Sequence, residues 1–158
     1  MAVPAARPTT EPDRSSLRLL QLTSFVSTLD RFAMPSVLLA ISRDLDVPLP
    51  SVVTAASVYY IAYGAMQPVW GIVSDRLGRV RTLRVTLLLA AVATAVSATT
   101  HDVAGLIVTR GIAGALFGAA MPTCLIYVGD VVPIRHRQQE VTRLLVGVAL
   151  GKIGRAHV

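Results

Sequence analysis

The sequence GIVSDRLGRVR, residues 71–81, is a basic turn with two glycines that joins two long apolar segments. Gly71 would allow a neighbouring helix to approach closely, and Gly78 would allow the chain to reverse direction within a few residues. Asp75 places a negative charge at the end of the preceding helix, where it can meet the N-terminus of another helix. A short basic turn between apolar segments is typical of the cytoplasmic side of a membrane protein.

The apolar segments on both sides of this turn are long enough to cross a lipid bilayer, which takes about 20 helical residues. The expected spans are residues 17–41, 52–73, 82–98 and 103–128, and a fifth begins near Leu144 after a polar connection. We therefore predict an all-α fold. It is a polytopic transmembrane helical bundle with four complete helices and the start of a fifth.

The composition agrees with a bilayer as the solvent. Hydrophobic residues make up 53% of the chain and charged residues 15%, whereas soluble domains carry roughly 25% charged residues. The net charge of +6 could suggest a nucleic-acid partner, but the basic residues lie at the ends of apolar segments rather than along one exposed face. We therefore expect no nucleic-acid partner. The single cysteine, Cys124, has no partner for a disulfide or a cysteine metal site.

The distribution of arginines predicts the orientation of the chain, because basic residues near helix ends are retained in the cytoplasm. The loop between the first two spans has only Arg43, and the loop between the third and fourth spans has no basic residue. The arginines of the other side are Arg7, Arg14, Arg18, Arg76, Arg79, Arg81, Arg84, Arg135, Arg137 and Arg143. We expect a multi-pass protein of the inner (plasma) membrane with a cytoplasmic N-terminus.

Both ends of the chain differ from its apolar middle. Residues 1–16 are rich in proline and small residues, which predicts a disordered cytoplasmic tail. Residues 17–151 are expected to form part of an N-terminal transmembrane half. Residues 152–158 change abruptly to a polar heptapeptide, and one reverse translation of them resembles a common sequencing adapter. This favours a non-native tail over a genuine polar C-terminus.

Three charged residues lie well inside the expected spans, away from their ends. Asp30 and Arg31 are near the middle of the first span, and Arg110 is inside the fourth. A charge in the hydrocarbon core is costly unless it faces water or a counter-charge. At 1.5 Å per residue, Asp30 and Arg110 both fall roughly 20 Å from the inner surface, so they could pair across the bundle. The three residues are candidates for proton or substrate handling, and a structural ion pair that only fixes packing is the alternative.

Several of these features resemble motifs of the major facilitator superfamily. Residues 71–81 are similar to its loop signature of a Gly, an Asp four residues later, then Arg, Gly and further basic residues; Val80 departs from it, and Arg81 can take that place. Residues 110–114, RGIAG, resemble the family's arginine with a glycine four residues later. Residues 29–35 are loosely similar to the helix-one motif of drug:proton antiporters. Asp130 resembles the acidic residue that relays charge to the loop arginines, with Arg79 as its partner.

This resemblance implies a fold, a mechanism and roles for individual residues. The fold would be the N-terminal part of a major facilitator fold, and Arg110 would take part in proton coupling. The loop residues that would latch the two halves of the transporter are Gly71, Asp75, Arg76, Gly78, Arg79 and Arg81. Helix packing is expected at Gly111, Gly114 and Gly118, because small residues let helices approach closely.

The function implied is proton-coupled secondary active transport by alternating access, with efflux of drug-like or metabolite small molecules as the first expectation. The alternatives are a proton-coupled symporter for uptake of a small organic solute and a truncated membrane protein that does not transport. The sequence has no nucleotide-binding glycine loop, metal-ligand cluster or nucleophile with its base, so we expect no enzyme activity, cofactor or metal. The expected partners are a small-molecule substrate, protons, the lipid bilayer and the missing C-terminal half of the same protein.

Overall fold

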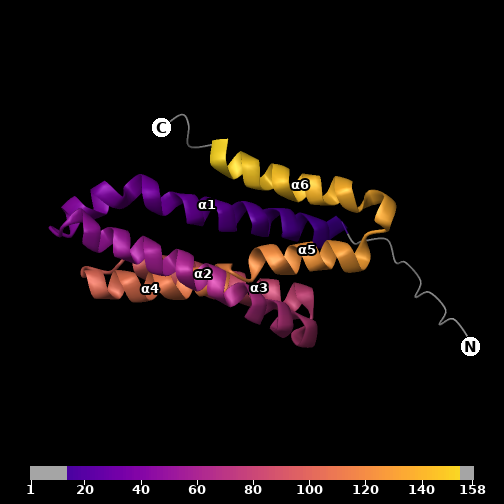
Figure 1. Cartoon of the computed structure of the whole chain (residues 1–158), viewed down its shortest axis with the longest axis horizontal. Helices are drawn as coiled ribbons and strands as arrows, with labels where there is room; N and C mark the ends of the chain where they lie inside the picture. Colours follow the sequence, from indigo (N-terminus) through magenta and orange to yellow (C-terminus); the bar gives the residue numbers. More distant parts are fainter. Residues whose placement is uncertain (1–13, 154–158) are drawn as a thin grey trace, which may run out of the picture.

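The computed structural model describes residues 14–153, and this part of the chain is helical and contains no strand (Figure 1). Its helices are α1 (Arg14–Asp44), α2 (Leu49–Leu77), α3 (Arg79–Ser97), α4 (Val103–Phe117), α5 (Ala120–Val131) and α6 (Ile134–Ile153). Four segments are long and apolar enough to cross a membrane, namely Arg18–Asp44, Leu49–Leu77, Arg79–Ser97 and Val103–Val131. The all-α prediction and the four expected spans are confirmed.

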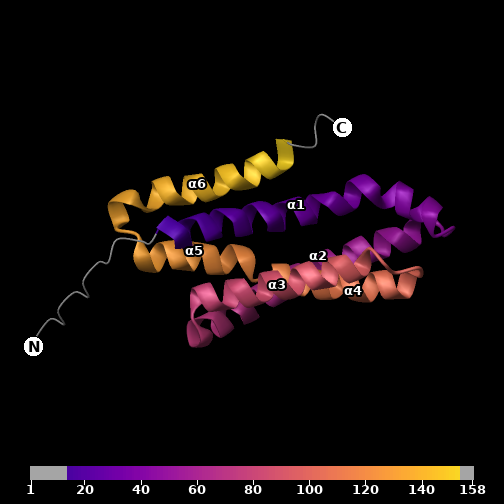
Figure 2. The ribbon, with the colours of Figure 1, turned by 180° about the vertical axis from the view of Figure 1, so that it is seen from behind.

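The helices lie side by side along one long axis. α2 lies between α1 and α4 and packs most extensively against α4, while α6 runs along α1 and α3 covers α2 and α4 from behind (Figures 1 and 2). Small buried clusters follow one another along this axis. The central cluster joins α2, α3 and α4 and contains Tyr59, Tyr63, Ala90, Ala113 and Phe117. The bundle therefore has a narrow core along its length instead of one compact centre.

The outer surface of the spans is apolar. Ile61 of α2 is 70% exposed and Leu88 of α3 is 68% exposed. In each of the four spans, at most 50% of the most apolar window is buried within the chain. Exposing large apolar side chains over whole helices suits hydrocarbon and not water. The chain is therefore a multi-pass membrane protein.

The structure shows two features of the helices that the sequence did not indicate. The fourth span is not one helix, because α4 ends at Phe117 and α5 begins at Ala120. Pro122 explains the break: proline has no N–H for the carbonyl of Gly118, and its ring conflicts with that carbonyl. α6 begins at Ile134, before the point near Leu144 where the fifth span is expected, so the polar connection is itself part of a helix. The polar residues expected in a connection, 135–143, lie on its exposed first turns.

The predicted tails fall largely outside the described residues. α1 begins at Arg14, so the last residues of the expected disordered tail, 14–16, are helical. At the other end, α6 continues through Lys152 to Ile153. The expectations for residues 1–13 and 154–158 lie outside the described residues.

Candidate functional site: a buried ion pair between α1 and α4

An ion pair inside the bundle joins the first and fourth spans. Arg110 Nη1 donates to Asp30 Oδ1 across 3.1 Å, and the two side chains are only 6% and 9% exposed. The contact arises because α1 and α4 enter from opposite ends of the bundle and meet at similar depth. The sequence indicated that Asp30 and Arg110 lie at equal depth, and in the structure their side chains are in contact.

Two further helices complete the surroundings of this pair. Thr94 of α3 donates its hydroxyl to the same Asp30 Oδ1 across 3.4 Å. The Arg110 guanidinium lies over the ring of Tyr59 in α2, 5.1 Å from its centroid. An aromatic face stabilises a cation that has left water. α1, α2, α3 and α4 thus all contribute to this polar site.

The pair leaves polar atoms without a partner. Asp30 Oδ2, Arg110 Nε and the Tyr59 hydroxyl are buried and have no hydrogen-bond partner among the described residues. Asp30 and Arg110 also line a cavity of about 340 Å³ whose other walls include Met34, Val37 and Leu106. An unpaired buried acceptor beside an unpaired buried donor suits a small polar group that donates to the first and accepts from the second.

Arg31 does not join this ion pair. Its guanidinium lies 5.2 Å from the ring centroid of Tyr63 and 5.3 Å from that of Phe32. Arg31 Nε is buried without a hydrogen-bond partner, and no carboxylate of the described residues lies within 4 Å of the side chain. Arg31 is therefore a cation held by two aromatic rings. Asp30 and Arg31 are adjacent in sequence but face different surroundings.

The turn between α2 and α3 forms a second charged cluster. Arg79, at the start of α3, pairs with Asp75 at the end of α2, and its Nε lies 3.2 Å from Asp130 Oδ2 of α5. Its Nη1 donates to the hydroxyl of Ser74 across 2.8 Å. The structure thus brings Arg79 and Asp130 together, as the sequence suggested, while the relay role of Asp130 stays a prediction. Arg76 and Arg81 are exposed and form no ion pair among the described residues.

The two glycines of this turn behave differently. Gly78 has φ +89°, a backbone conformation that side chains of L-amino acids rarely adopt, so the reversal requires glycine. A Cβ built on Gly71 would meet no atom within 4 Å. The close helix approach expected at Gly71 therefore does not occur within the described part of the chain.

The glycines of the fourth span do pack against a neighbour. A Cβ at Gly114 would overlap the backbone of Tyr59, and one at Gly118 would lie 2.7 Å from the carbonyl oxygen of Tyr63. At Gly111 the nearest atom would be a methyl of Val58, 3.1 Å away. These three glycines allow α4 to lie directly on α2, which places Arg110 over Tyr59.

Sequence reasoning missed two members of the site. Thr94 lies in an apolar segment where a threonine has no distinguishing signal, and only the packing of α3 places its hydroxyl on Asp30. Tyr59 does carry a signal, because its spacing from Tyr63 puts both rings on one face of α2, but that spacing fits an interface anchor as well as a cavity lining. The described residues contain no group of three or more His, Cys, Asp or Glu side chains placed to hold a metal ion.

In a comparison with known protein families, residues 20–153 match the family model described as Major Facilitator Superfamily. The chain is 28% identical over 119 residues to a triacylglyceride transporter of Mycolicibacterium smegmatis, covering 73% of this chain and 21% of the relative. It is 32% identical over 139 residues to the efflux pump dotC of Dothistroma septosporum, covering 88% of this chain and 22% of the relative. It is 30% identical over 132 residues to the MFS efflux transporter aclA of Aspergillus oryzae, covering 84% of this chain and 24% of the relative. The chain thus spans less than a quarter of the length of these curated relatives.

Proposed function

Because the chain belongs to the major facilitator superfamily, we propose that the full-length protein is a proton-coupled secondary active transporter that works by alternating access. We propose efflux of drug-like or metabolite small molecules as its direction and substrate class. Two of the three relatives are named for efflux, one as an efflux pump and one as an efflux transporter, which supports this choice. Transport, and not catalysis, is the activity proposed, with no cofactor.

The observation that carries this proposal is the buried pair of Asp30 and Arg110. Ionisable residues inside a membrane are expensive and usually serve a proton or substrate pathway. Asp30 Oδ2 has no hydrogen-bond partner among the described residues, whereas Oδ1 contacts Arg110 and Thr94, so we propose Oδ2 as the atom that takes up the proton. Protonation would neutralise Asp30 and leave Arg110 without its counter-charge, so the preferred arrangement of α1 and α4 would change. This gives proton binding a direct mechanical consequence.

The second part of the proposal concerns the turn between α2 and α3. We place this turn, with the N-terminus, on the cytoplasmic side of the inner (plasma) membrane, because the basic residues gather there. Arg76 and Arg81 form no ion pair among the described residues, and a Cβ on Gly71 would meet no atom within 4 Å, so we expect these positions to contact the second half of the full-length protein. Asp130 would hold Arg79 in place and link this latch to α5.

A second candidate function is proton-coupled uptake of a small organic solute. The observation that favours it is Arg31, a cation between two aromatic rings with no carboxylate within 4 Å in the part of the chain described. Such a cation would suit an anionic solute. An anionic substrate driven inward would therefore favour this candidate over efflux of apolar compounds.

The test uses the gene for the full-length protein and a proton-coupled transport assay in membrane vesicles. Asp30→Asn and Arg110→Ala should each abolish transport driven by a proton gradient while the protein remains in the membrane. Asp46→Asn and Arg84→Ala serve as matched controls, because both side chains are exposed and lie outside the pair. Undiminished proton-driven transport in both site variants would remove the assignment. Absence of transport by the unmodified protein would favour a membrane protein that does not transport.

A further inference from the structure

α1 contains a proline close to its charged residues. Pro35 lies inside α1, four residues after Arg31. In a regular helix the N–H of residue 35 would donate to the carbonyl of Arg31, but proline has no N–H. Hydrocarbon offers no water to replace that bond, so the carbonyl needs a donor from another part of the protein.

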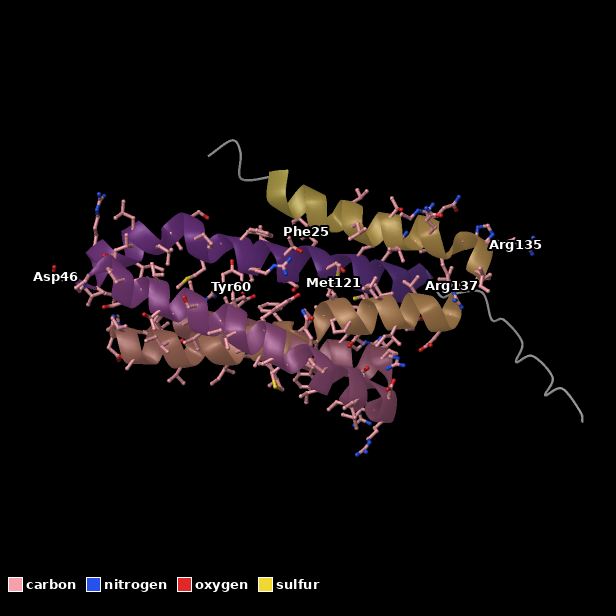
Figure 3. The ribbon with its side chains drawn as sticks, in the orientation of Figure 1. Phe25, Asp46, Tyr60, Met121, Arg135 and Arg137 are labelled. Atoms are coloured by element: carbon pink, nitrogen blue, oxygen red, sulfur yellow. The ribbon has the colours of Figure 1, made fainter. Side chains whose placement is uncertain are left out.

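Tyr60 of α2 supplies this donor. Its hydroxyl donates to the Arg31 carbonyl oxygen across 3.0 Å. The side chain lies in the space between α2 and α1, as its label in Figure 3 shows. A hydrogen bond from a neighbouring helix thus replaces the one that Pro35 removes. The carbonyl that accepts this bond belongs to Arg31, the residue next to Asp30 in the sequence.

We propose that Tyr60 is a positioning residue for the charged site. By holding the Arg31 carbonyl, it fixes the turn of α1 from which Asp30 reaches Arg110 and from which Arg31 reaches Tyr63. Without this bond, the turn before Pro35 would have one constraint fewer, and the carboxylate of Asp30 would no longer be held at one distance from Arg110. The role in transport rests on the proposed function, whereas the hydrogen bond itself does not.

A second contact of α2 follows the same principle. The indole Nε1 of Trp70 donates to the Ala115 carbonyl oxygen across 2.6 Å, just before the break between α4 and α5. At this break the N–H of Ala119 donates to Leu116, 3.1 Å away, three residues back instead of four. α2 therefore contributes one aromatic donor beside the proline of α1 and another beside the break between α4 and α5.

A double-mutant cycle in the full-length protein tests the proposal. Tyr60→Phe removes only the hydroxyl, and Pro35→Ala restores the backbone N–H that would take over the Arg31 carbonyl. The cycle is measured as the thermal unfolding midpoint in detergent, and as the rate and pH profile of proton-driven transport. Tyr127→Phe is the matched control, because its hydroxyl has no hydrogen-bond partner among the described residues. If the Pro35→Ala protein does not accumulate in the membrane, Pro35→Leu takes its place in the cycle, because residue 35 is exposed and a larger side chain fits there.

Tyr60→Phe should lower the unfolding midpoint by about 2 °C and slow transport about threefold, as a single hydrogen bond inside a membrane allows. It should also shift the pH profile, which a merely structural loss would not move. With Pro35→Ala or Pro35→Leu present, the same change should have no effect on either readout. Equal losses with and without Pro35 would overturn the proposal. If Asp30→Asn and Arg110→Ala both transport normally, the proposed role of the ion pair fails, but the cycle of unfolding midpoints still decides whether Tyr60 replaces the missing bond.

Discussion

Gly114 of α4 lies directly on the backbone of Tyr59 in α2, so closely that a Cβ built on the glycine would overlap the Tyr59 carbonyl. The two helices therefore touch backbone to backbone at this point, without an intervening side chain. Arg110 lies one turn before Gly114 on the same helix, and its guanidinium stacks on the Tyr59 ring. The packing of the glycine and the placement of the charged site depend on each other.

Replacing Gly114 should accordingly destabilise the bundle. Gly114→Ala should cost about 1–3 kcal/mol of folding free energy, the range for overpacking a close contact, even though alanine is the better helix former. Gly129→Ala in α5 is the matched control, because a Cβ there meets nothing within 4 Å. Thermal unfolding of the purified protein in detergent measures both. Equal unfolding midpoints for the two variants would contradict the role of Gly114.

Much of the fold follows from the sequence because membrane spans are set by length and apolarity. The positions of Asp30 and Arg110 along their helices were enough to predict a contact that the structure places at 3.1 Å. Helix rise alone carries that prediction. The turn at residues 71–81 was likewise predicted from its glycines and charges, and Gly78 adopts the positive φ that such a reversal requires.

The remaining features depend on tertiary contacts that periodicity does not encode. The break after Phe117 results from Pro122 acting on a helix already fixed against α2 by Gly114 and Gly118. The hydrogen bond from Thr94 to Asp30 and the one from Tyr60 to Arg31 join helices that are far apart in sequence. α6 begins at Ile134, before the expected fifth span, because exposed polar residues can extend a helix beyond its apolar segment.

Gly78 should tolerate no side chain. At φ +89° an alanine would be strained, so Gly78→Ala should cost on the order of 1–3 kcal/mol. Gly64→Ala in α2 is the comparison, since Gly64 has no neighbour within 4 Å of a Cβ and no positive φ. The fraction of folded protein after heating, measured by size-exclusion chromatography, distinguishes the two. A Gly78→Ala variant as stable as Gly64→Ala would show that the turn can adopt another conformation.

The charged cluster at the same turn should contribute little to stability. Asp75 and Asp130 are 61% and 55% exposed, and exposed ion pairs are worth about 0–1 kcal/mol. Asp130→Asn should therefore change the unfolding midpoint only slightly, because Arg79 keeps its ion pair with Asp75 and its hydrogen bond to Ser74. Any larger effect of Asp130→Asn should appear in transport, as the relay role predicts. A large loss of stability with normal transport would contradict that role.

Single cysteines should report the orientation of the chain. Cys124 is fully buried, so the unmodified protein should react poorly with a membrane-impermeant thiol reagent. Positions 101 and 84 are both exposed. His101→Cys should be labelled in intact cells, whereas Arg84→Cys should be labelled only after the membrane is permeabilised. The amount of label on each variant is read by mass spectrometry. The reverse pattern would place the N-terminus outside.

The Asp30–Arg110 pair should show strong non-additivity in stability. Removing one partner leaves the other charge buried, which costs about 3–5 kcal/mol, whereas removing both leaves no charge unpaired. Asp30→Asn and Arg110→Gln should each lower the unfolding midpoint, and the double variant should recover most of the loss. Proton-driven transport should stay absent in the double variant, because stability is restored without the proton acceptor. Losses that add would show that the two side chains act independently, and transport by the double variant would show that the pair serves packing alone.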